Sequence, residues 1–286
     1  MKKRILITGA KGFLGQYFVK EFEDEEVIPI THQDINLEDK NAIEKITSLK
    51  PDLVIHPAAI RSPDICEEDP EKAWKVNAVG TKHVAIACSL LDIPLIYIST
   101  DYVFSGGKDT PYTEFDPPNP INLYGKTKLY GEIFTKEFCK KHFIIRTSYV
   151  FGEYGNNALT QIYNSLKEGK EIKLSNYHFA SCTYAKDLVR KVKELSFTNL
   201  YGTYHIVNKG IITRYDFACK VAEIAGFSRE KVIPLNPETF KAPAKRPLYS
   251  VLRNYMLEIY DMDDLPYYEE SLRKAIYNIK FISAII

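Results

Sequence analysis

A glycine-rich turn between the first expected strand and the first expected helix restricts the fold of this chain more than any other feature. Residues 4–8 are a short apolar run typical of a buried strand, and residues 16–22 have the pattern of a helix. Between them, Gly9, Gly12 and Gly15 follow a Gly-x-x-Gly-x-x-Gly spacing. Such glycines allow a tight turn, a close approach of backbone to a pyrophosphate, and close packing of helix on strand. The turn therefore predicts a dinucleotide site at a helix N-terminus; a glycine turn without a ligand is the competing interpretation.

Strand and helix patterns alternate along the first half of the chain. Further strands are expected at residues 27–30, 53–56, 93–98 and 143–147, and helices at residues 36–49, 67–91 and 121–140. This alternation predicts an α/β fold with a doubly wound parallel sheet of the Rossmann type. We assign residues 1–150 to a dinucleotide-binding domain, completed by parts of residues 180–225. Residues 151–286 are expected to form mainly a smaller α/β domain that binds the substrate.

Three side chains near the fourth expected strand suggest acid–base chemistry. Thr100 follows that strand, and Tyr124 and Lys128 lie four residues apart at the start of the next helix. A tyrosine has a pKa of about 10, and a nearby ammonium lowers it. We predict that Tyr124 exchanges a proton during ketone reduction, that Lys128 lowers its pKa, and that Thr100 holds the carbonyl oxygen. A solvated Tyr and Lys at an ordinary helix start is the competing interpretation.

The end of the second expected strand bears on the choice of cofactor. An acidic residue at that end would bind an adenosine ribose and favour NAD. Here the strand ends in Thr31-His32-Gln33, and the acid comes later, at Asp34, beside Ile35 on the expected adenine side. Lys11, in the glycine turn, is placed to meet a 2′-phosphate. The sequence therefore favours NADPH slightly over NADH and leaves the use of both open.

Several loop residues are further candidates for binding. Ala58 and Ala59 are small enough to let backbone lie close to a cofactor, and Arg61 either clamps a diphosphate or is a surface charge. Arg246, in a basic loop, has the same two interpretations. Tyr149 follows the fifth expected strand and is expected to line a sugar pocket. Asn157 lies in a Gly-Asn-Asn turn whose amides are expected to meet a ligand. Asn77 is either bonded to backbone beside the fourth expected strand or solvated.

Composition excludes several functions. A formal net charge of +1 over 286 residues gives no field that would attract nucleic acid or a membrane surface. The five cysteines are scattered, which indicates neither a zinc site nor a disulfide framework and fits a reducing, cytoplasmic location. The apolar N-terminal run is broken by the glycine turn, so we expect neither a signal peptide nor a membrane span.

The motifs together resemble the extended short-chain dehydrogenases/reductases, and more narrowly the dTDP-4-dehydrorhamnose reductase family. The resemblance is nearly end to end. It rests on residues 9–15, 97–104, 122–128, 146–152, 155–157, 202–205 and 246–252. It implies that Tyr124 is the proton donor, that Lys128 also binds the nicotinamide ribose, and that Thr100 and Asp101 hold a 4-keto nucleotide sugar. It further implies that the cofactor meets Gly12, Phe13, Leu14, Asp34, Ile35, Ala59, Ile60 and Arg61. Some members bind magnesium, which no acidic cluster in this sequence requires.

The chain departs from the family pattern at two places. Tyr149 stands where the family usually has a tryptophan that touches the sugar. The segment 61–64, Arg-Ser-Pro-Asp, is closer to the regulatory β subunit of methionine adenosyltransferase, which acts as a binding partner. The sequence therefore predicts an NAD(P)H-dependent reductase of a nucleotide-linked 6-deoxy sugar. A non-catalytic NADP-binding regulator is the alternative, an epimerase or dehydratase is less favoured, and a homodimer stays open.

Overall fold

A parallel sheet is the centre of the fold. The computed structural model describes residues 2–237 and 241–285. Six strands pair in the order β2-β1-β3-β4-β5-β10, and every pairing is parallel. The strands are β1 (Arg4–Ile7), β2 (Glu26–Pro29), β3 (Leu53–His56), β4 (Leu95–Thr100), β5 (His142–Thr147) and β10 (Gly202–His205). The strand order reverses between β1 and β3, which is where a doubly wound sheet places its binding crevice. The predicted fold class is confirmed.

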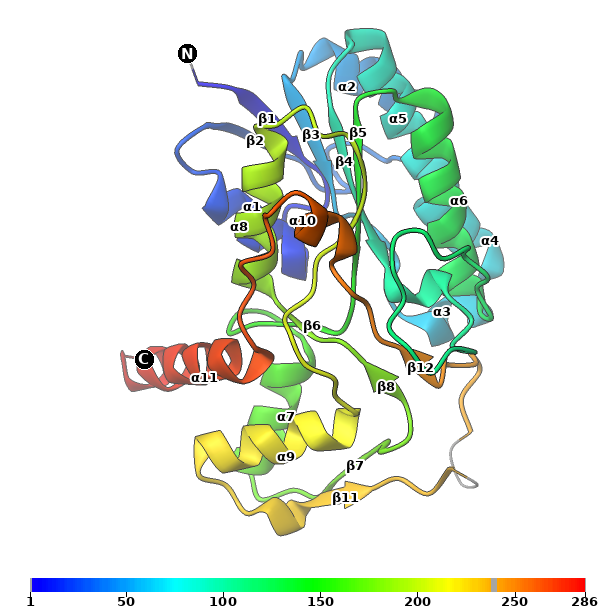
Figure 1. Cartoon of the computed structure of the whole chain (residues 1–286). Coiled ribbons are helices and arrows are strands. Elements are labelled where there is room, and N and C mark those ends of the chain that lie inside the picture. The colour runs from blue at the N-terminus through cyan, green and yellow to red at the C-terminus, as the bar shows by residue number, and fades with distance from the viewer. Residues whose placement is uncertain (1, 238–240, 286) are drawn as a thin grey trace.

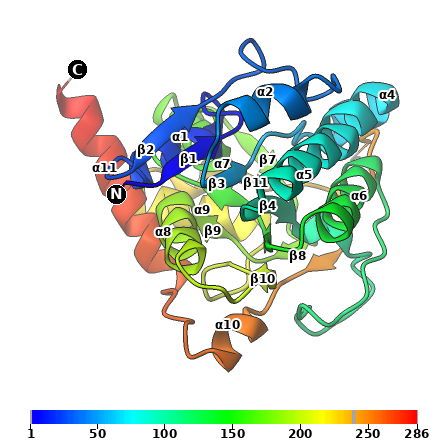
Figure 2. The ribbon, with the colours of Figure 1, turned by 90° about the horizontal axis from the view of Figure 1, so that it is seen from above.

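Helices cover both faces of the sheet, as Figure 2 shows. One face carries α1 (Phe13–Glu21) and α8 (Ala185–Ser196), and the other carries α2 (Ala42–Ser48), α5 (Gly80–Leu91) and α6 (Leu123–Phe138). Because side chains alternate along a strand, Ile5 and Ile7 pack against Phe18 of α1, whereas Leu6 packs in the core with Val84 of α5. The strands are apolar on both faces, which is typical of a parallel sheet.

A second core lies below the sheet in Figure 1. It is formed by α7 (Ala158–Lys167), α9 (Arg214–Ala225) and α11 (Tyr268–Ile285). Three short strand pairs lie in this part of the chain: β6 (Val150–Phe151) with β9 (Thr183–Tyr184), β7 (Ile172–Leu174) with β11 (Val232–Pro234), and β8 (Phe179–Ala180) with β12 (Tyr249–Ser250). Strand β10 and helix α8 come from beyond residue 150 but complete the main sheet and its cover. The proposed division of function near residue 150 stays a prediction.

Two expected helices differ from the structure. The long helix expected at residues 67–91 is broken into α3 (Pro63–Glu68), α4 (Pro70–Ala73), a π-helical turn, η1 (Trp74–Val79), and α5. Pro70 has no N–H to continue α3, and the Asp69 side chain caps α4 by accepting from Lys72 N at 3.0 Å. The helix expected at residues 36–49 begins only at Ala42. Asn36 and Asp39 accept backbone N–H groups two residues ahead and so hold turns there instead.

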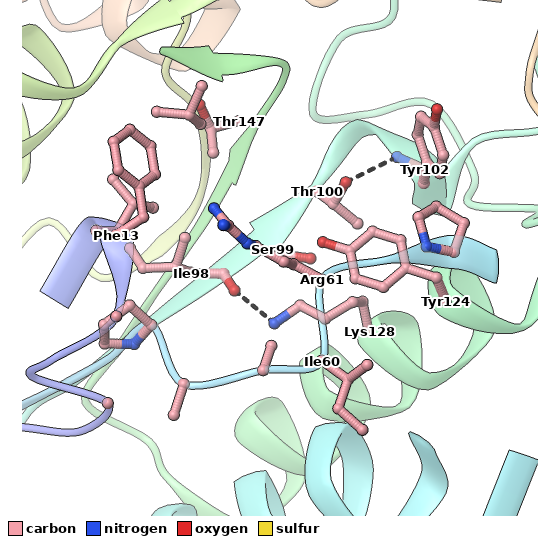
Figure 3. A pocket seen from close by; sticks show the side chains of 18 of the residues that line it. Phe13, Ile60, Arg61, Ile98, Ser99, Thr100, Tyr102, Tyr124, Lys128 and Thr147 are labelled. Carbon is pink, nitrogen blue, oxygen red and sulfur yellow. Dashed lines mark hydrogen bonds between the residues drawn. The ribbon is translucent and has the colours of Figure 1, made fainter. Parts of the chain in front are cut away.

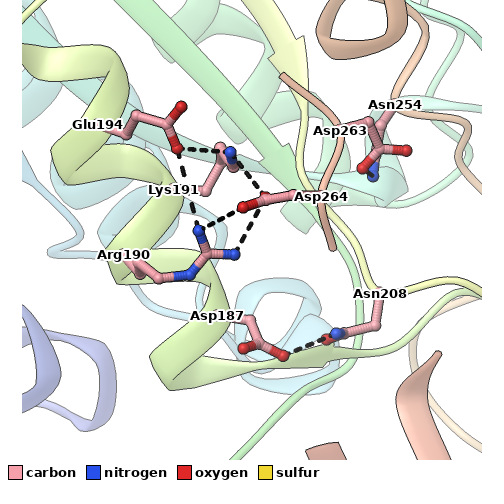
Figure 4. A network of polar contacts seen from close by, with 8 residues as sticks. All are labelled: Asp187, Arg190, Lys191, Glu194, Asn208, Asn254, Asp263 and Asp264. Atoms are coloured by element: carbon pink, nitrogen blue, oxygen red, sulfur yellow. Dashed lines mark hydrogen bonds and ion pairs between the residues drawn. The ribbon is translucent and has the colours of Figure 1, made fainter. Parts of the chain in front are cut away.

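The segment after α10 (Tyr255–Ile259) is fastened to α8 by charge, as Figure 4 shows. Asp264 receives Arg190 at 2.8 and 3.1 Å and the ammonium of Lys191 at 2.7 Å. The Lys191 side chain is only 1% exposed, so this ion pair compensates a buried charge. Asp187 accepts from Asn208 in the same region, which ties α8 to the chain after β10.

Candidate active site

A cavity of about 670 Å³ opens at the carboxyl ends of the sheet strands. It lies where the strand order reverses, the expected position of a ligand in such a sheet. The structure brings most of the predicted site residues into its lining. These are Gly9, Gly12, Phe13, Leu14, Gly15, Ile35, Ala58, Ala59, Ile60, Arg61, Thr100, Asp101, Tyr124, Lys128, Tyr149 and Arg246.

The glycine turn forms one wall of the cavity. Gly9 has φ +58°, and a Cβ there would lie 3.1 Å from Ala58. A Cβ at Gly15 would lie 2.1 Å from the carbonyl oxygen of Gly9, so no other residue fits while helix and strand keep this packing. Helix α1 begins at Phe13, and no side chain caps its N-terminus at Gly12. Its first amide groups are therefore oriented for an anion.

Thr100, Tyr124 and Lys128 meet on the opposite wall, as Figure 3 shows. Asn122 caps α6 by accepting from Gly125 N at 2.8 Å, which fixes the helix start that carries Tyr124. Lys128 is buried, and its Nζ donates to the carbonyl oxygen of Ile98 at 2.7 Å. The tyrosine hydroxyl and the lysine amine both point into the cavity beside the end of β4.

Burial controls the protonation of this cluster. It raises the pKa of Tyr124, an effect that a hydrogen bond with Thr100 partly opposes. Burial also lowers the pKa of Lys128 to about 7, against the charge of Glu132, which raises it. The prediction that Lys128 lowers the pKa of Tyr124 is wrong for this structure. The prediction took account of the neighbouring amine but not of burial. Burial removes water from the phenol and so disfavours the phenolate. Tyr124 therefore carries its proton at neutral pH, as a donor must.

Asp101 holds three elements together beneath the cavity. Its buried carboxylate accepts from the hydroxyls of Ser148 at 2.8 Å and Ser250 at 2.6 Å. Thr100 donates to it at 3.0 Å, so the single hydroxyl proton of Thr100 must rotate away before Thr100 can donate to a carbonyl. Burial raises the pKa of Asp101, and these hydrogen bonds oppose that effect. The main role of Asp101 in this structure is therefore to hold the ends of β4, β5 and β12 together through hydrogen bonds.

The two arginines predicted at the site, Arg246 and Arg61, both line the cavity and have different partners. Arg246 is paired with Asp64, its Nη1 lying 2.9 Å from Oδ1 and its Nη2 bonded to Oδ2. Arg61 donates to the carbonyl oxygen of Asn156 at 2.7 Å and lies 5.7 Å from the ring of Phe13. Arg61 and Asp64, the two charged residues of the Arg-Ser-Pro-Asp segment, therefore each bind a loop that is distant in the sequence.

Asn77 is buried, and its side chain is used fully by backbone and a hydroxyl. It accepts from Ile60 N at 2.8 Å and donates both to Ile60 O and to Thr127 Oγ1 at 3.1 Å. The first of the two interpretations, a bond to backbone, is confirmed. The partner is the loop after β3 rather than the strand that carries Thr100.

Three predicted site residues do not line the cavity. Lys11 is exposed on the glycine turn. The carboxylate of Asp34 accepts from the amide and hydroxyl of Thr31 at 2.8 and 2.7 Å, which closes its own turn. Asn157 caps α7 and donates to the carbonyl oxygens of Gly152 and Tyr154, so its side chain stabilises the 152–157 loop. Their roles in ligand binding stay predictions.

The structure adds residues that the sequence did not reveal. Tyr102, Ser148, His178, Arg214 and Ser250 line the cavity. Tyr102 follows Asp101, and Ser148 precedes Tyr149. Both neighbours were predicted as site residues, so the position of Tyr102 and Ser148 at strand ends could have identified them. Arg214 and His178 come from the second core, and no motif in the sequence connects them with the strand ends.

Within residues 2–237 and 241–285, no group of three or more His, Cys, Asp or Glu side chains is arranged to hold a metal ion. Over the same ranges, every helix is too short or too polar to cross a bilayer.

Known proteins resemble this chain over nearly its whole length. A dTDP-4-dehydrorhamnose reductase from Mycolicibacterium smegmatis is 32% identical over 281 residues, 96% of this chain and 86% of the relative. The crystal structure of dTDP-4-dehydrorhamnose reductase from Bacillus anthracis in complex with NADP superposes with a TM-score of 0.94 at 37% identity, covering 97% of this chain and 100% of that one. Methionine adenosyltransferase 2 subunit beta from Danio rerio is 33% identical over 276 residues, 90% of this chain and 84% of the relative. The sequence model of the RmlD substrate binding domain matches residues 2–281, and the chain belongs to that family.

Proposed function

We propose that the protein reduces the 4-keto group of a nucleotide-linked 6-deoxy sugar with NAD(P)H, converting dTDP-4-dehydrorhamnose to dTDP-L-rhamnose. The observation that carries this proposal is the meeting of Thr100, Tyr124 and Lys128 in one cavity with the glycine turn. A relative with this activity in its name and a neighbour solved with NADP support it.

The glycine turn fits a dinucleotide, because Gly9 adopts φ +58° and the close packing at Gly15 excludes any Cβ, as the glycines of dinucleotide-binding turns require. When bound, a reduced nicotinamide supplies the hydride. Gly12, Phe13 and Leu14 would hold the pyrophosphate, and Ile35, with Asp34 behind it, would lie on the adenine side. Residues 58–61 would hold the central part of the cofactor. We retain the slight preference for NADPH, since no carboxylate lies directly at the end of β2.

Tyr124 donates the proton that the new hydroxyl of the sugar requires. Its raised pKa keeps the proton in place until negative charge develops on the carbonyl oxygen. Thr100 turns its hydroxyl proton from Asp101 to that oxygen, and Asp101 keeps the hydroxyls of Ser148 and Ser250. Lys128 stays anchored on the carbonyl oxygen of Ile98, and its amine would bind the nicotinamide ribose when the cofactor is bound. Tyr149, Arg246 and the loop capped by Asn157 would border the sugar nucleotide.

Oxidation of NADPH and of NADH, followed by absorbance with a panel of 4-keto nucleotide sugars, tests the proposal. We expect oxidation that depends on the sugar and on the intact cavity. Absence of oxidation with every sugar of the panel would contradict the proposal.

A regulatory role is the second candidate, and one observation favours it. The Arg61 to Asp64 segment resembles the regulatory β subunit, and Asp64 uses its carboxylate to hold Arg246. A regulator would bind NADP without turnover and would form a stable complex with another enzyme. Co-purification of a stoichiometric partner, together with no sugar reduction, would favour this role.

A further inference from the structure

A guanidinium without a carboxylate partner faces the cavity from the second core. Arg214 is the first residue of α9, and its Nη2 lies 3.4 Å from the hydroxyl of Tyr102. Among residues 2–237 and 241–285, no Asp or Glu oxygen lies within 4.0 Å of its nitrogens. A cation that is largely removed from water is costly unless an anion compensates it.

The other groups on this wall are already compensated or neutral. Arg246 is neutralised by Asp64 through two contacts. His178 has its pKa lowered to about 4 by burial and by the charges of Arg214 and Arg246, so it is uncharged at neutral pH. Asp101 is occupied by three hydroxyl groups. Arg214 is therefore the positive charge on this wall that is available to a ligand.

The backbone is strained where Arg214 is supported. Tyr149 has φ +38°, an uncommon conformation for a bulky residue. In this conformation its ring lies 5.7 Å from the guanidinium carbon of Arg214 and edge-on to Phe217, with a centroid separation of 5.3 Å. Strain of this kind persists mainly where function requires a particular side-chain position. The ring of Tyr149 serves as a platform for the guanidinium.

The position of Arg214 also specifies which anion it meets. Tyr102, its hydrogen-bond partner, lies edge-on to Tyr124 with ring centroids 6.0 Å apart. Tyr102 therefore separates the guanidinium from the tyrosine that we assign as the proton donor, and all three side chains line the same cavity. In a nucleotide-linked hexose, the anomeric diphosphate lies across the sugar ring from the 4-keto carbon. A planar guanidinium matches the oxygens of a phosphate well.

We propose that Arg214, supported by Tyr149 and Tyr102, binds the diphosphate of the nucleotide sugar and selects substrates that carry it. This inference rests on the proposed function, and it assigns to Arg214 the diphosphate contact that the sequence suggested for Arg246. Arg246 instead acts as a positioning residue that joins the loop at Asp64 to the substrate side of the cavity.

Calorimetric titration of the full-length protein, with NADP present, tests this assignment. The ligands are thymidine and uridine diphosphates and the corresponding nucleosides. For Arg214→Gln we expect affinity for the diphosphates to fall about 10- to 100-fold, with unchanged affinity for the nucleosides and for NADP. Arg214→Lys is expected to keep part of the affinity. The matched control is Arg253→Gln, which removes a guanidinium that is half-exposed and paired with Glu258 outside the cavity.

The outcomes separate this inference from the proposed function. Equal diphosphate affinity in the wild type and Arg214→Gln overturns the inference, as does a wild type that binds neither diphosphate. Loss of diphosphate affinity specific to Arg214→Gln supports it, even if no 4-keto sugar is reduced. Unchanged NADP affinity in Arg214→Gln shows that the variant is folded.

Discussion

Lys128 donates its Nζ to the carbonyl oxygen of Ile98 at 2.7 Å, which joins the helix that carries Tyr124 to the strand that ends in Thr100. The amine also lies 4.1 Å from the centre of the Tyr97 ring. The same contact fixes the amine one helical turn from the tyrosine and removes it from bulk water. This arrangement places the amine near the proton donor at a cost in stability, because burial disfavours the protonated form of the amine.

Replacing Lys128 by methionine is expected to stabilise the fold in a pH-dependent way. The pKa of Lys128 falls from 10.5 to about 7 on folding. Between these values the unfolded chain binds more protons than the folded one, so the stability of the wild type rises with pH. Lys128→Met should therefore gain on the order of 3 kcal/mol over the wild type at pH 6 and much less at pH 10.

Urea unfolding at pH 6, 8 and 10 measures this gain. Lys126→Met, on an exposed position of the same helix, is the matched control and should show no such trend. A gain for Lys128→Met that is the same at every pH would contradict the assignment of a buried, weakly basic amine.

Glu132 and Arg146 form a buried ion pair below the cavity, and breaking it should be costly. Their side chains are 1% and 2% exposed, and two contacts of 2.9 and 2.7 Å join them. Glu132→Gln leaves a buried guanidinium without a counter-charge, which typically costs about 3–5 kcal/mol. The double replacement Glu132→Leu with Arg146→Met should recover most of that loss in thermal or urea unfolding.

Glu258→Gln is the control for this measurement, because it breaks an exposed pair with Arg253. Its cost should stay below about 1 kcal/mol. If Glu132→Gln cost no more than Glu258→Gln, the buried pair would not be a support of the site.

Removing the Ser250 hydroxyl should weaken the support below Thr100. Ser250 donates to the buried carboxylate of Asp101 at 2.6 Å. Ser250→Ala withdraws a hydrogen bond to a charged group, which is worth about 1.5–3 kcal/mol, and the pKa of Asp101, already raised by burial, should rise further. Comparison of unfolding free energies with Ser89→Ala, an exposed serine on α5, measures the effect. Equal costs for the two variants would rule out a supporting role for this bond.

Local patterns in the sequence predicted the sheet and much of the cavity. The glycines of the first turn, the apolar strands and the polar residues at strand ends are signals carried by neighbouring residues. Thr100, Tyr124 and Lys128 could therefore be placed before any tertiary contact was known. Pro70 in the sequence also indicates a break in the helix. The apolar spacing on both sides of it is that of an ordinary helix, so the π-helical turn could not be predicted.

What the sequence did not reveal depends on contacts between distant segments. Arg246 and Asp64 are 182 residues apart, so their ion pair could not be inferred from spacing. Arg214 reaches Tyr102 across 112 residues. The pKa of Tyr124 was predicted in the wrong direction because burial is a property of the folded chain. Asp34 and Asn157 looked available to a ligand, but nearby backbone groups use their side chains.

The central claim is that Tyr124 is the proton donor, and Tyr124→Phe tests it most directly. The measurement is kcat for NADPH oxidation with a 4-keto nucleotide sugar, together with NADPH affinity by fluorescence titration. Tyr130→Phe, on an exposed position of the same helix, is the matched control. We predict that Tyr124→Phe lowers kcat about 100- to 10,000-fold with unchanged NADPH affinity, and that Tyr130→Phe keeps wild-type kcat. A Tyr124→Phe variant that turned over within a few-fold of the wild-type rate would contradict the account.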